Sequence, residues 1–562
     1  MSVSINAGRR ALVLASAAVT ALGLSLTGLP SAHAATPSYI EQGGDNPVTA
    51  APPVSRPPTQ HCTVTLAKDF PSNTASGAPQ NFSGTLTPPT RCKGPWSKVV
   101  LDYTTTVSGR QYDRSGSLDI GGVNVWFGTT QEPGGAKPTT FHFSKDITQY
   151  TSLLKSAQSF SGGIGNYTSD VYTGVYDQTV TITYYRADRP HPAPKTPDKV
   201  VAVPVSDLTP DSSAATATLS DLPRNITRAD LQVTLKGNGC DEQWFTAVPN
   251  QVAAKFPGDG LCQESAYREA LVSVDGAPAG AVGTYPHIYS GGIVPTLWRP
   301  VLAIDTLDLR PEHLDLTPFA GRLVDGQPHR ITVSMQPIGD RWNVKAVLFL
   351  YTDHHRAQTA GKLTTDDVAT TPHTSTTSHS PEAGTVAYAE SARRADETAG
   401  YVDTSAGRVY TTVKNTRSWR NAGSVSDNGM VQSIDQSDHL SQRSTSRVDH
   451  HVVRSSSVRE SYPISVDFSA ANYTDDQNFS LNGTVHMGQQ VTSLVRDGRR
   501  PMMRHWNWTV DSYGVLARAN GVTSESDGHS TSSYHGTDDL GRPYWHLIRT
   551  NHGKVLSDRH SR

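Results

Sequence analysis

The amino-acid sequence predicts an all-β protein that is divided into several antiparallel domains. Its 562 residues far exceed one ordinary domain of about 150 residues, so we expect three or four domains. The 46 glycines and 36 prolines, together with only 36% hydrophobic residues, are typical of short strands joined by many turns. The formal charge of −2 provides no basic stripe for a phosphate backbone, and we therefore expect no nucleic-acid partner.

The N-terminus has the three parts of a secretory signal peptide. Arg9 and Arg10 precede an uncharged apolar run at 11–29, and Ala-His-Ala at 32–34 offers small residues for cleavage. The apolar run is almost long enough to span a membrane, but the cleavage site favours its removal. We predict a signal peptide at 1–34, a secreted and extracellular mature protein, and no membrane partner after cleavage.

The segments that follow predict two β domains joined by a short linker. Residues 35–60 are rich in Pro and Gly and lack strand alternation, so we interpret them as a tail or a wrapping segment. In the first domain, 61–188, the run 171–184 alternates aromatic or apolar with polar residues, which predicts a long half-buried strand. Prolines stiffen the linker at 189–200, and the second domain, 201–356, ends in another strand-like run.

The rest of the chain predicts a second linker and a third β domain. Residues 357–386 are rich in Ser and Thr and poor in apolar side chains, so we expect a linker or a long loop. The C-terminal domain, 387–562, alternates Val, Tyr and Thr with polar residues. Its Asp-Asn-Gly at 427–429, Asn-Gly at 482–483 and Asp-Gly at 527–528 are typical of hairpin turns. The domain has no motif of known chemistry, and binding, wrapping and packing stay open as its role.

Four cysteines in an exported chain indicate two disulfides, for which three pairings are possible. Proximity in sequence favours Cys62 with Cys92 and Cys240 with Cys262, since each bond closes a short loop within one predicted domain. Metal ligation is disfavoured because no Cys-x-x-Cys spacing occurs. The adjacent histidines of the two Asp-His-His triplets point to opposite faces of a strand, so we expect no metal site.

Carboxylates are the candidates for chemistry. The sequence contains no Gly-rich phosphate loop, no Gly-x-Ser-x-Gly or His-Glu-x-x-His motif and no cysteine left unpaired. Acidic residues lie beside aromatic, Arg or Cys residues, which is the composition of a sugar-binding cleft with a proton-transfer group. Ordinary surface ion pairs are the alternative interpretation of any single cluster. The clusters are Tyr112-Asp113-Arg114, Gln131-Glu132-Pro133, Tyr167-Thr168-Ser169-Asp170, Cys240-Asp241-Glu242-Gln243-Trp244 and Tyr267-Arg268-Glu269.

Several segments, taken together and in order, resemble those of one enzyme family. They are Gly121-Gly122-Val123, the runs 145–154 and 170–176, Tyr267-Arg268-Glu269, and the runs 290–300 and 314–319. The family is that of the A-type peptide-N4-(N-acetyl-β-glucosaminyl)asparagine amidases, the acid glycoamidases, and the resemblance covers residues 62–353 and, more loosely, the third region. It implies a hydrolase that cleaves the amide between Asn and the innermost GlcNAc of N-glycopeptides and glycoproteins. The products are Asp and a glycosylamine, and neither a metal nor a cofactor is required.

A more distant resemblance to the flavobacterial-type peptide N-glycanase implies the fold and the catalytic residues. That enzyme consists of two adjacent eight-stranded jelly rolls with a cleft between them. By this resemblance Asp113 is the catalytic acid or base, Asp170 orders the network between the domains, and Glu269 hydrogen-bonds the sugar or the amide. Asp170 stands where that enzyme has Glu, so its side chain is one methylene shorter.

Further residues are expected to bind the substrate. Arg114 would orient Asp113, the tryptophans would stack on GlcNAc faces, and the two glutamates are reserve acids. A tryptophan is, however, more often part of a hydrophobic core. The expected substrate-binding residues are Arg114, Arg268, Trp298, Trp244, Glu132 and Glu242, with Trp126 as a further stacking candidate.

Two other functions fit the same residue types. A glycoside hydrolase also places two carboxylates in a sugar cleft, but it leaves GlcNAc on the Asn. A lectin-like module binds glycopeptide without cleaving it, because fold does not determine function. Carboxylate catalysis, together with 21 histidines that gain charge in acid, predicts a pH optimum below neutrality.

Overall fold

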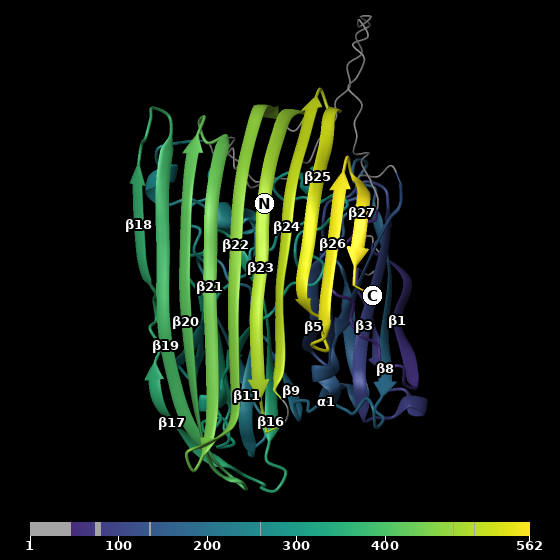
Figure 1. The fold of residues 1–562 in the computed structure, drawn as a ribbon, viewed down its shortest axis with the longest axis vertical. Helices are drawn as coiled ribbons and strands as arrows, with labels where there is room; N and C mark the ends of the chain where they lie inside the picture. The colour runs from purple at the N-terminus through teal and green to yellow at the C-terminus, as the bar shows by residue number, and fades with distance from the viewer. Residues whose placement is uncertain are drawn as a thin grey trace, which may run out of the picture.

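The computed structural model describes residues 46–72, 80–133, 137–258, 260–475, 477–498 and 501–561. Nearly every element in these residues is a β-strand, and the strands of each sheet pair antiparallel (Figure 1), so the all-β prediction is confirmed. No helix in this part of the chain is long and apolar enough to cross a membrane. The predicted signal peptide and the first residues of the predicted wrapping segment lie outside the described residues.

The first domain is a sandwich of two four-stranded sheets. Its sheets have the orders β1-β8-β3-β6 and β2-β7-β4-β5, so the first strand pairs with the last and the inner pairs nest within them, as in a jelly roll. In β8, Tyr176, Val180 and Ile182 are buried and Asp177 is exposed, which is the alternation expected from the sequence. The strands are β1 (His61–Ser72), β2 (Phe82–Leu86), β3 (Trp96–Ser108), β4 (Ser115–Ile120), β5 (Val123–Thr129), β6 (Thr139–Asp146), β7 (Gln158–Ile164) and β8 (Val175–Arg186).

The second domain repeats this nested arrangement. Its sheets have the orders β14-β11-β16-β9 and β10-β15-β12-β13, and again the first strand pairs with the last. Two long connections leave the sandwich: 239–269 with η3 (Gly239–Asp241), η4 (Trp244–Thr246) and α2 (Asn250–Ala253), and 283–311 with η5 (Pro295–Trp298). The strands are β9 (Lys199–Val203), β10 (Ala214–Leu219), β11 (Ile226–Asn238), β12 (Ala270–Val274), β13 (Ala277–Val282), β14 (Glu312–Asp315), β15 (His329–Met335) and β16 (Arg341–Thr352).

The third region is one long sheet in which each strand from β19 to β27 pairs with the next. Strands β17 and β18 both pair with β19, along different parts of its length. The strands are β17 (Ala360–Asp367), β18 (His373–His379), β19 (Val386–Thr404), β20 (Gly407–Ser426), β21 (Val431–Val448), β22 (His451–Asp475), β23 (Asn478–Arg496), β24 (Met502–Ala519), β25 (Val522–Thr537), β26 (Pro543–Asn551) and β27 (Lys554–His560).

Two expectations for the third region are corrected. The segment 357–386, expected to be a linker or a long loop, contains β17 and β18, because the β-branched Thr favours strands and β19 supplies the hydrogen-bond partners. Of the three predicted hairpin turns, only that at 427–429 joins two strands. Gly483 lies inside β23 and Gly528 inside β25, and each packs against the connection 283–311, closely at Gly528, where a β-carbon would lie 2.6 Å from the Thr296 carbonyl oxygen, and less closely at Gly483.

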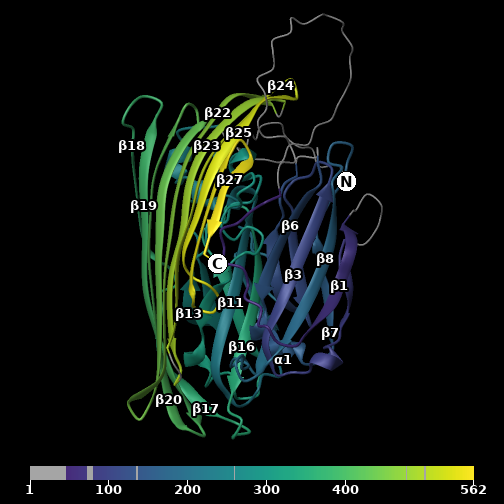
Figure 2. The same cartoon turned by 45° about the vertical axis from the view of Figure 1, so that its right-hand side comes forward.

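The three regions form one body. Figure 2 shows the long sheet standing against both sandwiches, with its C-terminal strands on the side of the first. Residues of the second sandwich and of β22 to β26 share one hydrophobic core, which joins Trp298 and Val301 to Val485 and Trp508. The described part of the N-terminal segment wraps across the body, as Ser55 hydrogen-bonds Asp539 at 2.5 Å and Val48 bridges Val301.

Both predicted disulfides are present, Cys62–Cys92 and Cys240–Cys262. The first ties β1 to the short turn before β3, and the second closes the connection 239–269. Both predicted pairings are therefore confirmed. The second disulfide bears on the site because Glu242 lies within the loop that it closes.

Candidate active site

Three half-buried carboxylates come from the two sandwiches. Asp113 lies in the connection between β3 and β4, Glu132 follows β5, and Glu242 follows η3. All three acids were candidates from the sequence, although Glu132 and Glu242 were only reserve acids. The structure brings them into electrostatic contact, since the charge of Asp113 raises the pKa of both glutamates and that of Glu132 adds to the rise at Glu242.

Gly291 is the point on which two of the carboxylates converge. Its backbone N–H donates to Asp113 Oδ2 at 2.7 Å. A β-carbon on Gly291 would lie 2.0 Å from Glu132 Oε2 and 3.1 Å from Asp113 Oδ2, so no side chain fits here. The neighbouring Ser290 Oγ accepts the Glu132 N–H at 2.6 Å, which fastens the loop of the second sandwich to the strand end of the first.

Two buried cations from the second sandwich face this group of acids. Arg299 Nη2 lies 3.4 Å from Glu132 Oε1. Lys236 Nζ donates to Asn238 Oδ1 at 2.7 Å and lies 5.0 Å from the centre of the Tyr289 ring. The charge of Lys236 acts on both Asp113 and Glu242, so one cation serves two of the three acids.

Burial is the main cause of the altered acidities. It raises the pKa of Glu132 to about 7, which the charge of Arg299 opposes and that of Asp113 reinforces. Burial also raises the pKa of Glu242 to about 8, and the charge of Asp113 adds to this effect. Burial raises the pKa of Asp113 as well, but the Gly291 N–H and Lys236 favour its ionised form. Below neutrality Glu132 and Glu242 therefore keep their protons, and Asp113 is the acid whose ionised form receives a backbone hydrogen bond.

Arg114 holds the loop beside the site. Its Nη2 donates to Gln111 Oε1 at 2.6 Å and to the Tyr167 carbonyl at 3.3 Å. It makes no hydrogen bond to Asp113, but its charge opposes the rise in pKa that burial causes at that carboxyl. Arg114 was expected to orient Asp113. In the structure it supports the loop that carries Asp113 and places a positive charge near that carboxyl.

Asp170 stands apart from the three acids. It lies in the connection between β7 and β8, and its side chain is exposed. The same connection does reach the site, because Tyr172 stacks on Tyr112 with ring centres 4.1 Å apart. Within the described residues Asp170 itself contacts none of the buried acids, so its predicted role between the domains has no geometric support.

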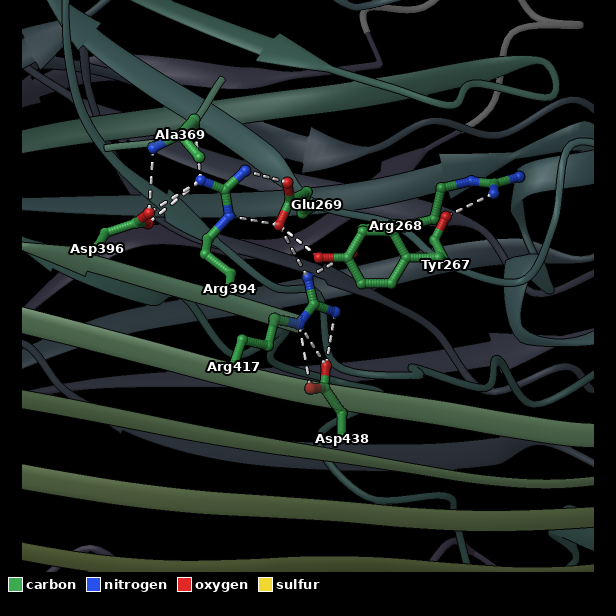
Figure 3. A network of polar contacts seen from close by, with 8 residues as sticks. All are labelled: Tyr267, Arg268, Glu269, Ala369, Arg394, Asp396, Arg417 and Asp438. Atoms are coloured by element: carbon green, nitrogen blue, oxygen red, sulfur yellow. Dashed lines mark hydrogen bonds and ion pairs between the residues drawn. The ribbon is translucent and has the colours of Figure 1, made fainter. Parts of the chain in front are cut away.

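Glu269 and Arg268 belong to a different network, drawn in Figure 3. Glu269 Oε1 accepts from Arg394 Nη2 at 2.6 Å, and its Oε2 accepts from Tyr267 Oη at 2.5 Å. Asp396 and Asp438 in turn pair with Arg394 and with Arg417, which lies 3.7 Å from Glu269. Every charge here is buried and paired, and the network joins the second sandwich to β19, β20 and β21.

Arg268 is also fully buried and paired. Its guanidinium donates to Asp241 Oδ1 from both Nε at 2.9 Å and Nη2 at 2.7 Å. Asp241 accepts further bonds from the N–H groups of Gly339 and Asp340, each at 2.8 Å. Neither Arg268 nor Glu269 is brought together with Asp113, so their geometry favours a role in holding the domains together.

The tryptophans expected to stack on sugar are core residues. Trp298 has no exposed surface, and its indole N–H donates to the Gly292 carbonyl at 2.9 Å. Trp244 and Trp126 are buried too. A ring without an exposed face offers no platform for a sugar, and the structure therefore disagrees with stacking by these three residues.

The long sheet supports the loop that carries Gly291. Gly483, Gly514 and Gly528 lie directly opposite one another on β23, β24 and β25. A β-carbon at Gly514 would lie 2.7 Å from the Leu297 nitrogen, and one at Gly528 would lie 2.6 Å from the Thr296 carbonyl oxygen. This row of glycines, hereafter the glycine row, leaves room for η5 to pack against the sheet. In the chain η5 lies between Gly291 and Arg299.

Hydrogen bonds fix η5 on the glycine row. Thr296 Oγ1 donates to the Val515 carbonyl at 3.1 Å, and Ser530 Oγ donates to the Leu297 carbonyl at 3.1 Å. The charge of Arg518, on the same strand as Gly514, lowers the pKa of Glu132. The third region, to which the sequence assigned no chemistry, therefore supports the site directly.

Sequence reasoning missed Lys236, Arg299, Ser290 and the backbone N–H of Gly291. The run 290–300 contributes to the family resemblance, but nothing in it predicts a role for Ser290 or Arg299. Lys236 lies in a strand whose pattern does not indicate catalysis. A backbone donor has no signature of its own in a sequence. Only the close approach of the two sandwiches reveals these groups.

Comparison with known proteins gives three findings. Residues 47–369 match the family model of peptide N-acetyl-β-D-glucosaminyl asparaginase amidase A. The chain is 31% identical over 335 residues to peptide-N4-(N-acetyl-β-glucosaminyl)asparagine amidase A of Prunus dulcis, which covers 55% of this chain and 58% of that protein. The chain thus spans less than two thirds of the length of that relative.

Solved structures give weaker similarities. A crystal structure of peptide-N(4)-(N-acetyl-β-D-glucosaminyl)asparagine amidase aligns with a TM-score of 0.35 and 13% identity, over 52% of this chain and 96% of that one. The structure of PNGF-II aligns with a TM-score of 0.36 and 14% identity, over 52% of this chain and 66% of that one.

Proposed function

Since the chain belongs to the peptide N-acetyl-β-D-glucosaminyl asparaginase amidase A family, we propose that it hydrolyses the amide that joins Asn to the innermost GlcNAc of N-glycopeptides and glycoproteins. The products are an Asp-containing peptide and a glycosylamine. The observation that carries the proposal is the convergence of Asp113 and Glu132 on Gly291, with Glu242 close enough for their charges to raise its pKa.

Asp113 is the general base of the proposed reaction. An amide carbonyl is a poor electrophile, so the attacking water must lose a proton as its oxygen bonds to the carbonyl carbon. Burial raises the pKa of Asp113, and the hydrogen bond from Gly291 N–H together with the charges of Lys236 and Arg114 opposes this rise and favours the ionised form. It therefore takes the proton of the water.

Glu132 is the general acid. Its pKa of about 7 keeps it protonated at the acidic pH expected for this reaction. It gives its proton to the amide nitrogen as the C–N bond breaks, and the proton held by Asp113 then restores Glu132. Arg299 and Lys236 bring positive charge to the oxyanion that forms on the carbonyl, and Glu242 hydrogen-bonds the sugar in its protonated form.

We also propose that the protein acts outside the cell. The signal-peptide pattern at 1–34 and the two disulfides both support export to an oxidising compartment. An acidic surrounding would also suit a reaction that needs Glu132 protonated.

The test is incubation of the mature protein with a defined N-glycopeptide at about pH 5, followed by mass analysis of the peptide. We expect conversion of Asn to Asp by the wild type and a rate loss of at least about 10³-fold in Asp113→Asn, which keeps the shape of the side chain. Asp170→Asn, an exposed acid in the adjoining loop, is the matched variant and should retain its rate within about twofold.

Other results would lead to other functions. GlcNAc left on the Asn would identify a glycoside hydrolase. A glycopeptide that binds and stays intact would identify a lectin-like module. A large loss in Asp170→Asn with full activity in Asp113→Asn would exchange the roles of the two residues.

A further inference from the structure

His546, Asp558 and His560 gather at the C-terminal edge of the long sheet, away from the acids described above. Strands β26 and β27 pair so that His546 stands opposite His560, and Ile548 opposite Asp558. Side chains two positions apart lie on the same face of a sheet, so all three project together. One ligand atom from each residue lies within 4.8 Å of those from the other two.

We propose that these three residues bind one divalent transition-metal ion, with Zn²⁺ as the best fit. Two imidazoles and a carboxylate are ligands that Zn²⁺ accepts in a tetrahedral site that leaves one position open. Bonds of about 2.0–2.2 Å place such ligand atoms about 3.4 Å apart. His546 Nε2 lies 2.7 Å from Asp558 Oδ1, and His560 Nδ1 lies 3.7 Å from the same oxygen, so the observed spacings bracket this value.

Only side-chain rotations are needed to admit the ion. His546 is buried and well placed, whereas the side chains of Asp558 and His560 are about half exposed, at 44% and 54%. An exposed carboxylate and an exposed imidazole can each turn by a fraction of an ångström without disturbing a packed core. The backbone pairing of β26 and β27 therefore already provides the spacing of the site.

A second hydrogen bond orients the buried ligand. Tyr544 Oη lies 3.2 Å from His546 Nδ1. With an ion on Nε2, the neutral ring keeps its single proton on Nδ1, which then donates to the tyrosine oxygen. A partner of this kind is usual for a metal-binding histidine, since it fixes the tautomer and the orientation of the ring.

The open position faces a groove. His546, His560 and Tyr544 line a cavity of about 1540 Å³ between the long sheet, the N-terminal segment and the first sandwich. Water or an oxygen donor can complete the coordination from there. The ion would also fasten β27, the last strand of the sheet order, to β26.

The site is distinct from the other histidine–aspartate pairs of the sheet. His486 and Asp511 lie opposite each other on β23 and β24, with Nδ1 and Oδ1 2.8 Å apart. Among the described residues, however, a third ligand completes only the group of His546. This pair thus provides a control in the same sheet with similar exposure.

The experiment is isothermal titration of the untagged, chelator-treated full-length mature protein with ZnCl₂ at pH 7.5, since a polyhistidine tag would hide the signal. We expect one ion per chain with an affinity that falls at least about tenfold in His560→Ala and in Asp558→Asn. His486→Ala should bind like the wild type. Substitution with Co²⁺ should add visible absorption bands of a four-coordinate ion, and these bands should vanish in His546→Ala.

The proposal does not depend on the amidase activity. One Zn²⁺ lost on substitution of any member of the group and kept in His486→Ala would establish the site. No binding by the wild type, or equal binding by wild type and His560→Ala, would overturn it. Because His560 and Asp558 are exposed, their variants should fold, which a thermal melt in the absence of metal can verify.

Discussion

A buried and a half-buried group of carboxylates in this protein have opposite electrostatic surroundings. Glu269 meets Arg394 and Arg417, whose own charges are shared with Asp396 and Asp438, and every member is paired. Asp113, Glu132 and Glu242 are instead close to one another, and burial leaves two of them with a pKa of about 7 and about 8.

The difference separates a structural network from a chemical one. A carboxylate that is ionised and paired with arginines on every side does not exchange protons near neutrality, and its ion pairs hold two parts of a protein together. Acids that share too few cations keep protons near neutrality and can transfer them. The sequence placed Glu269 among the catalytic candidates and Glu132 among the reserve acids, and the partners of the two side chains reverse that order.

Removal of Glu269 should cause the largest effect on stability. Glu269→Ala leaves Arg394 and Arg417 buried without their shared carboxylate, and we expect unfolding to become easier by about 3–5 kcal/mol. Denaturant unfolding measures this change. The folded fraction should retain nearly full turnover of glycopeptide, and a selective loss of turnover with unchanged stability would instead make Glu269 a member of the active site.

Gly291→Ala should reverse that pattern. The new methyl group would displace the Glu132 carboxylate from its place beside Asp113, because it would lie 2.0 Å from Glu132 Oε2. We expect kcat to fall about 100-fold while the melting temperature changes little. Steady-state kinetics and a thermal melt check this, and unchanged kinetics would show that the two acids do not work together.

Gly514→Ala should test the support from the long sheet. Its β-carbon would lie 2.7 Å from the Leu297 nitrogen, so η5 must shift and carry Gly291 with it. We expect kcat to fall about tenfold with KM nearly unchanged. Gly483→Ala, which meets only the Val294 and Ile293 side chains and the Leu297 side chain, is the milder control. Faster hydrogen exchange at residues 291–298 would show the shift without relying on activity.

The pH dependence of stability should give the smallest effect. Burial raises the folded-state pKa of Glu132 to about 7 and of Glu242 to about 8, so the folded protein binds more protons than the unfolded chain above the ordinary pKa of Glu. Their contribution is fully present below about pH 4.3 and is lost as the pH rises through about 8. The melting temperature of the wild type should therefore fall as the pH rises over this range. In the double variant Glu132→Gln and Glu242→Gln it should fall by a few degrees less. An identical dependence of melting temperature on pH in the two proteins would contradict the assigned shifts.

Local patterns were enough for much of the architecture. The alternation at 171–184 predicted β8, and the short loops between cysteines predicted both disulfides, because strand period and loop closure are local properties. The same local view misassigned 357–386 and the glycines at 483 and 528. A glycine that ends a strand and a glycine that makes room for another segment look alike in a sequence.

The sequence by itself determined the all-β class, the cysteine pairs and a short list of acids that includes Asp113, Glu132 and Glu242. Only the tertiary structure decided which acids act together. Glu269 and Glu132 are both acids beside polar residues in the sequence, but one meets the arginines of the long sheet and the other lies beside Asp113 at the loop that carries Gly291. The acidity of a carboxyl depends on burial and on charges a few ångströms away, and these come from residues that are remote in sequence.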